Sequence, residues 1–171
     1  MEIELDYFRK KESSSDLVSE KESTDYKEKA DEKANEFNKL QMQRDMMISQ
    51  TARENEDMFA AKLIKTFREP FRDGYLSRTE REKYYQREYF KFLDFNDASL
   101  INSPVLTRKI FNFLVTFNKP GFTPEEREKE YIKAVDIIIS EIRHDDESAS
   151  ENIPGNYLVY EFVIKYLVNG F

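Results

Sequence analysis

The sequence predicts an all-α protein, an antiparallel bundle or array of about five to six helices that includes a long charged N-terminal helix. Three observations support this fold class. Residues 23–53 contain neither proline nor glycine, apolar residues in later segments recur every three or four positions, and Ser or Thr precedes several of these segments. The first property favours a continuous helix, the second places side chains on one helical face, and the third marks helix starts.

Charge and aromatic content divide the chain near residue 58. The net charge is −7, of which residues 1–58 carry −6, and only four of the 24 Phe and Tyr residues lie there. The hydrophobic core should therefore lie after this point. We predict a flexible lead-in or the tail of a preceding domain over residues 1–22, a long charged helix over residues 23–54, and a compact aromatic-rich helical domain over residues 55–171.

Within the lead-in, Ile3, Leu5 and Tyr7 alternate with acidic residues, which also permits one half-buried strand. The long helix that follows has only a narrow, interrupted apolar stripe, too thin for a core helix. We predict that it rests on a partner surface through an interaction face. The residues of that face are Tyr26, Phe37, Leu40 and Met47. We interpret the nearby Met42, Met46 and Met47 as gap-filling residues in a helix interface, and secondarily as an adaptable binding surface.

The segment from Tyr84 to Phe95 places six aromatic residues in twelve positions. A capping-box pattern at Ser77 and Glu80 predicts that a helix starts just before it. We predict a core aromatic face shared by this helix and a later one. Its residues are Tyr85, Tyr89, Phe92, Phe113 and Phe117.

Four further segments show helical spacing of apolar residues. The expected buried faces are Phe59, Leu63 and Phe67 in residues 58–67; Leu106, Ile110, Phe113 and Phe117 after the Ser103-Pro104 start; Tyr131, Val135, Ile138 and Ile142 after the Thr123-Pro124 start; and Val159, Val163 and Tyr166 in residues 156–168. The last segment is rich in β-branched residues, but thirteen residues is long for a strand, so we predict a helix. Residues 94–102 are predicted to form a loop with one helical turn.

Few residues of the chain are of a type or spacing that indicates catalysis or metal binding. The chain has no cysteine and one histidine, and we find no nucleophile, base or glycine-rich phosphate loop. His144 precedes three acidic residues and offers metal ligands, but without a second histidine or a cysteine we favour a solvated loop. Five tyrosines could line a ligand groove or simply border the core, and we favour the latter: Tyr75, Tyr84, Tyr85, Tyr89 and Tyr131. We predict no catalytic residue, no metal, no cofactor and no enzymatic activity for this chain.

The acidic balance, with a pI near 5.0, argues against nucleic acid as a partner. The apolar runs are far shorter than the roughly 20 residues that span a bilayer. Residues 1–6 lack the basic start and apolar core of a secretory signal.

Several short motifs together resemble a known family. They are Glu88–Phe90, Asp94–Asp97, Leu100–Pro104, Lys109–Leu114, Ala134–Ile138 and Tyr160–Leu167. This pattern is similar to the helical region of TlpA-like, thioredoxin-family envelope proteins of Gram-negative bacteria, where it lies between an N-terminal β-domain and a C-terminal thioredoxin domain. The resemblance covers residues 56–171, whereas residues 23–53 match only as a charged helix. The chain departs from the family pattern through an insertion at residues 145–154.

The resemblance implies a non-catalytic accessory domain that positions or dimerises a redox domain at the cell envelope or in the periplasm. Its partner would then be a protein, either its own thioredoxin domain or a second copy. The family's Cys-x-x-Cys pair has no counterpart here, so no catalytic residue is carried over. An alternative is a self-standing scaffold whose residues 23–53 pair with a helix of another protein.

Overall fold

The computed structural model describes residues 1–13, 20–143 and 156–169, which contain seven α-helices, one 3-10 helix and no strand. This confirms the all-α fold class. The helices are α1 (Glu2–Ser13), α2 (Glu20–Glu54), α3 (Phe59–Thr66), α4 (Arg78–Arg87), η2 (Ala98–Asn102), α5 (Pro104–Val115), α6 (Pro124–Ile142) and α7 (Tyr157–Asn169). They divide into two compact units, residues 1–91 and 92–171. This division differs from the predicted one at residue 55, because α3 packs on α2.

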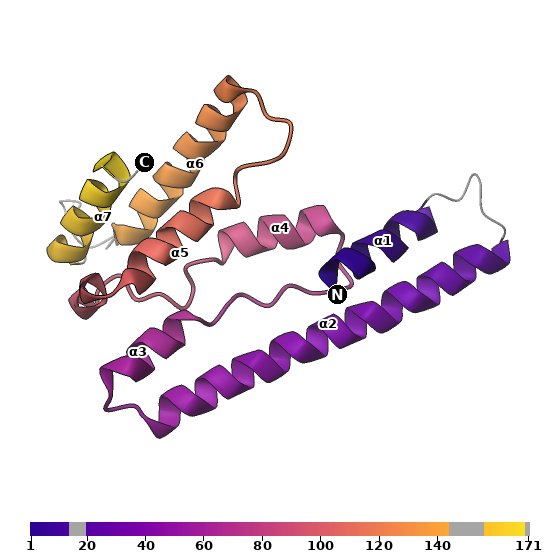
Figure 1. The fold of residues 1–171 in the computed structure, drawn as a ribbon, viewed down its shortest axis with the longest axis horizontal. Coiled ribbons are helices and arrows are strands. Elements are labelled where there is room, and N and C mark those ends of the chain that lie inside the picture. The colour runs from indigo at the N-terminus through magenta and orange to yellow at the C-terminus, as the bar shows by residue number, and fades with distance from the viewer. Residues whose placement is uncertain (14–19, 144–155, 170–171) are drawn as a thin grey trace, which may run out of the picture. The chain divides into compact units, whose positions relative to one another are not determined.

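In the first unit, α2 is the longest helix, and α1 and α3 pack along it (Figure 1). Its inward face is made largely of small residues. Ala30 and Ala34 are fully buried, and together with Phe37 they form one hydrophobic cluster with Leu5 of α1. Because an alanine side chain extends little beyond the backbone, α1 can approach α2 closely over this stretch. The predicted long helix is therefore present, and much of its thin apolar stripe is covered within the chain.

The expectation of an irregular lead-in is wrong for the part of it that the structure describes. Residues 2–13 form α1, not a strand or a flexible tail. The alternation of Ile3, Leu5 and Tyr7 was misleading, since in the helix only Leu5 of these three is buried. Helical geometry instead aligns Leu5 with Phe8, three residues later, against α2.

The connection between α3 and α4 is fastened to α2 by polar side chains. Gln41 forms two hydrogen bonds with the backbone of Arg72: its Nε2 donates to the carbonyl oxygen at 2.8 Å and its Oε1 accepts from the amide at 2.9 Å. One turn earlier, Asn38 Oδ1 accepts from the Gly74 amide at 2.7 Å, and Asn38 Nδ2 donates to Asp73 at 2.9 Å. These side-chain amides satisfy backbone groups that would otherwise lose hydrogen bonds on burial.

Two predicted faces in the first unit differ from the structure. In α3 the buried residues are Ala61 and Thr66, while Phe59 and Phe67 are exposed. The aromatic helix ends at Arg87, so the aromatic residues after it lie in turns. The start of α4 is as predicted, because Ser77 and Glu80 form a reciprocal capping box.

In the second unit, α5 and α6 form a helical hairpin and α7 packs beside α6 (Figure 1). The predicted face of α5 is confirmed. Its residues Leu106, Ile110, Phe113 and Phe117 are all buried. The predicted starts also hold: Ser103 caps α5, Thr123 and Glu126 form a capping box on α6, and the last segment is the helix α7. In α6, Ala134 is buried with Ile138 and Ile142, whereas Tyr131 and Val135 are only half-buried. The predicted loop at His144 lies outside the described residues.

We expect the substitution Gly74→Ala to destabilise the first unit by roughly 1–3 kcal/mol, the usual range for overpacking. A Cβ at this position would lie 2.8 Å from Ala34 Cα and 2.9 Å from the Ala34 carbonyl oxygen. Because these are backbone atoms of α2, no rotamer change relieves the contact. Urea unfolding followed by circular dichroism measures the loss. The variant Gly74→Ala/Ala34→Gly should recover little of it, and full recovery would contradict this explanation.

Candidate functional site

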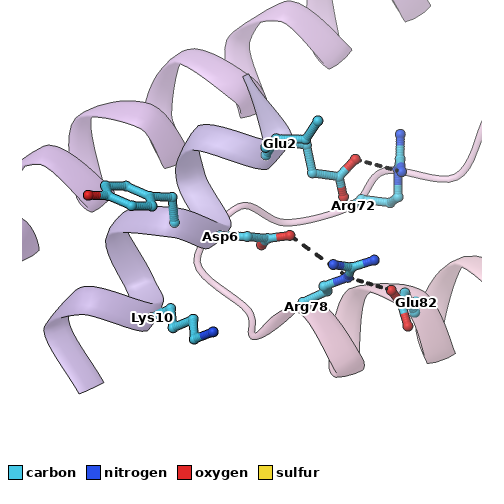
Figure 2. Close-up of a pocket in the computed structure, with 8 residues that line it drawn as sticks. Glu2, Asp6, Lys10, Arg72, Arg78 and Glu82 are labelled. Atoms are coloured by element: carbon cyan, nitrogen blue, oxygen red, sulfur yellow. Dashed lines mark hydrogen bonds and ion pairs between the residues drawn. The ribbon is translucent and has the colours of Figure 1, made fainter. Parts of the chain in front are cut away.

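An open cavity of about 480 Å³ in the first unit gathers charged side chains from α1, α4 and the segment before α4. Its lining residues are Glu2, Ile3, Asp6, Tyr7, Lys10, Arg72, Arg78 and Glu82. We call it the arginine cavity. Figure 2 shows two arginines facing carboxylates of α1: Arg72 Nη1 lies 3.1 Å from Glu2, and Arg78 Nε lies 3.9 Å from Asp6. Glu2 and Asp6 are four residues apart, which places both on one side of α1.

A third arginine, Arg81 of α4, holds this arrangement together. Its side chain is only 1% exposed. One terminal nitrogen donates to the carbonyl oxygen of Leu76 at 2.6 Å, the other pairs with Asp6, and its Nε lies 3.5 Å from Glu2. A buried charge is tolerated only where such partners compensate its lost hydration. Arg81 thus joins α4 to α1 across more than 70 residues of sequence.

Arg72 combines an ion pair with aromatic contacts. Its guanidinium carbon lies 4.8 Å from the ring centre of Tyr85 and 5.7 Å from that of Phe37, within the range of cation–π attraction. Burial raises the pKa of Tyr85 to about 12 and raises the pKa of Tyr89 as well. Both phenols are therefore neutral near pH 7 and unsuited to act as bases. The predicted core residues Tyr85 and Tyr89 serve to pack, with ring centres 5.3 Å apart.

The chemistry of the arginine cavity is that of ion pairing. Arginine stays protonated, and the carboxylates here face guanidinium groups instead of a reacting group. Among the described residues, no three His, Asp or Glu side chains gather in a way that would hold a metal ion, and no helix is long and apolar enough to cross a bilayer. Sequence reasoning missed this cluster. The four-residue spacing of Glu2 and Asp6 was a weak signal for it, but nothing in the sequence joined them to Arg81.

The four residues of the predicted interaction face do not share one surface. Phe37 is buried against α1, and Tyr26 is half-buried with its ring 6.4 Å from that of Phe8. Only Leu40 and Met47 are exposed. Two further methionines of α2, Met42 and Met46, are exposed as well.

This exposed stretch of α2 we call the outer methionine face. It consists of Leu40, Met42, Gln43, Met46, Met47 and Gln50. Met46 and Met47 are 69% and 65% exposed. The only charged residues between positions 40 and 51 are Arg44 and Asp45, and both bond within the unit: Arg44 donates to Glu69 at 2.9 Å, and Asp45 accepts from Arg68 at 2.7 Å. In a chain with 36% charged residues, the six residues of this face include four apolar side chains and no charge.

The second unit holds the other predicted core aromatics and one further groove. Phe113 and Phe117 are buried with ring centres 5.1 Å apart, while Phe92 is half-buried. A groove of about 460 Å³ along α6 is lined in part by Tyr131 and Ile132. The five tyrosines considered for a ligand groove are not all brought together, since Tyr131 belongs to this unit and the others to the first.

No known protein family, curated protein or solved structure matches this chain.

We expect Arg81→Met to destabilise the first unit by roughly 2–4 kcal/mol, since it removes a buried ion pair. The Leu76 carbonyl oxygen loses its donor, and Asp6 keeps only the more distant Arg78. The matched control is Arg78→Met. Arg78 is 70% exposed and also pairs with α1, so we expect a loss within about 1 kcal/mol. Urea unfolding at pH 7 compares the two, and equal losses would contradict a special role for Arg81.

We expect Asp73→Ala to lower stability by roughly 1–2 kcal/mol at pH 7, because Asp73 accepts hydrogen bonds from the Tyr75 amide and Asn38. These bonds hold the pKa of the Asp73 carboxyl below 3.8, its usual value. A lowered folded-state pKa contributes stability above the unfolded-state value and loses it as the pH falls through the folded-state value. The difference between wild type and variant should thus be constant from pH 7 to 5 and shrink below about pH 4. A difference that persists at pH 2 argues against this origin.

Proposed function

We propose that this chain is a non-catalytic helical module that binds a helix of a protein partner on the outer methionine face of α2. The observation that carries the proposal is the exposure of Leu40, Met42, Met46 and Met47 on a stretch whose only two charges are engaged elsewhere. Methionine is flexible and polarizable, so it adapts to varied apolar surfaces.

Burial of these four side chains would stabilise a complex by a modest amount. Each of these four side chains is roughly half exposed or more. Removing the exposed part from water is worth on the order of 1 kcal/mol for each. The sum favours association without requiring a large interface, although the entropy of binding offsets part of it. Such a surface supports a weak or regulated complex better than a permanent one.

The arginine cavity is a poor candidate for a ligand site, which also favours the outer methionine face as the binding surface. Its cations are paired with carboxylates of the same unit, so a ligand would have to replace existing ion pairs. We assign it the role of holding α1 against α2 and α4. The inner face of α2 is thereby occupied, and the outer methionine face is left for a partner.

The resemblance to the helical region of TlpA-like envelope proteins offers a setting for this role. In that setting the module would position or dimerise a thioredoxin domain in the periplasm. The supporting motifs lie in residues 88–167, mostly in the second unit, whereas the proposed contact surface lies in the first. A downstream Cys-x-x-Cys within a βαβ pattern in the coding sequence would support this setting.

A photo-crosslinking experiment tests the binding role. The full chain carrying p-benzoylphenylalanine in place of Met47 is irradiated in the cells that express it, and cross-linked peptides are identified by mass spectrometry. We expect one partner peptide with helical apolar spacing, and at least a tenfold loss of the adduct when Met46→Glu is added, because a carboxylate on the face resists burial.

The matched control carries the photo-crosslinker in place of Ile132, which is also exposed but lies on α6. It should not give the same adduct, and Ile132→Glu should leave the Met47 adduct unchanged. No adduct at position 47, or the same adduct at position 132, would refute the proposed binding surface.

A further inference from the structure

We infer that the partner on the outer methionine face is a second copy of this chain, bound through α2 in antiparallel orientation about a twofold axis between Arg44 and Asp45. This inference rests on the proposed function and names its partner. A twofold contact is self-complementary, so each residue on one side of the axis must suit the residue at the matching distance on the other side. The sequence of α2 meets this condition.

Two series of exposed residues, each with a spacing of seven, run along the outer side of α2. One is Glu36, Gln43 and Gln50, and the other is Lys39, Met46 and Arg53. They interleave at intervals of three and four, so they line one side of the helix. Met46 is the apolar member of this line, and Leu40 and Met47 flank it. The inner side of α2, with Ala30 and Ala34, is covered by α1, so the seam and the intramolecular contacts do not compete.

The antiparallel arrangement places opposite charges against each other at both ends of these series. With the axis between residues 44 and 45, Glu36 faces Arg53 of the second copy, and the symmetry repeats the ion pair at the other end. Gln43 faces Met46 near the axis, and Lys39 faces Gln50. No two like charges stand opposite each other between residues 36 and 53. Opposite charges at the ends of a contact fix its orientation and register.

The flanking positions agree with this register. Leu40 comes beside Met47 of the second copy, which closes an apolar contact on each side of the axis. Lys33 comes beside Glu54 in the same way. Within one chain Lys33 pairs with Glu36 at 3.0 Å, so the dimer places each of these two charges next to a second opposite charge. Within one chain, Glu54 accepts from Gln50 at 2.8 Å, so its carboxylate already lies next to the seam.

A parallel pair would be unfavourable, because identical residues then face each other. Glu36 would meet Glu36, Lys39 would meet Lys39, and Arg53 would meet Arg53. Like charges in close contact are destabilising and exclude wrong arrangements. The charge order along α2 therefore selects the antiparallel pair.

The size of the contact predicts its strength. Residues 36–54 span about 27 Å of helix at 1.5 Å per residue. One helix pair of this length lies at the low end of interface sizes, below about 1,200 Å². We expect a reversible dimer with a dissociation constant on the order of micromolar.

Sedimentation of the purified full chain tests the dimer. Wild type should show a concentration-dependent monomer–dimer equilibrium. Glu36→Arg and Arg53→Glu should each weaken it at least tenfold, and the double variant should restore most of the affinity because the pair is re-formed with reversed charges. A monomer at all concentrations up to about 1 mM, roughly a thousand times the expected micromolar constant, or a double variant weaker than both single variants, overturns the inference.

Cysteine cross-linking tests the orientation, since the natural chain has no cysteine to interfere. A mixture of the Glu36→Cys and Arg53→Cys proteins should form a disulfide between copies under mild oxidation, whereas each alone should not. Two copies of position 36 would lie about 25 Å apart in the antiparallel pair, beyond disulfide reach. Cross-linking of Glu36→Cys alone would show a parallel pair and overturn the inference.

The experiments distinguish failure of the proposed binding surface from failure of the proposed dimer. If the Met47 photo-adduct contains a peptide from a different protein and the purified chain is monomeric, the binding surface stands and the second copy is rejected. If neither the adduct nor the dimer forms, both are rejected.

Discussion

The structure of the first unit depends on how closely other segments approach α2. Gly74 lies against the backbone of Ala34 with no room for a Cβ, and Leu5 lies over the same alanine turn. This approach is possible only because the inner face of α2 carries small residues. It brings the backbone of residues 72–74 within reach of Asn38 and Gln41, whose amides then bond to it. A helix with too little apolar surface for an ordinary core is held instead by close packing and polar contacts.

The same approach fixes the arginine cavity. Once residues 72–74 are anchored on α2, Arg72 lies over Tyr85 and faces Glu2 of α1. Arg81 completes the cluster from α4 and is buried with its partners. Some of the charged residues that the sequence suggests are on the surface therefore form ion pairs inside the unit. Because they neutralise each other, the cavity stabilises the unit and offers little chemistry.

The function that we propose depends on the surface of α2 that the other segments do not cover. The inner side of α2 is filled by α1 and by the chain before α4. The outer methionine face carries no charged side chain and is exposed. The order of charges around that stretch is self-complementary only in the antiparallel sense, which connects an exposed surface to a particular partner. The accessory role implied by the TlpA-like resemblance is compatible with such a dimer and stays a prediction.

The sequence by itself determined the local structure. The caps at Ser77, Ser103 and Thr123 and the buried face of α5 were predictable, because they depend on residues within a few turns of each other. What it could not determine were contacts between distant segments. Phe37 was expected on an interaction face but is buried, because residues 2–13 form a helix that covers it. Nothing in the sequence indicated that helix. Arg81 was not singled out, because its partner Asp6 is 75 residues away. Periodicity shows which side of a helix is apolar, but only tertiary packing decides which segment covers that side and which side stays exposed.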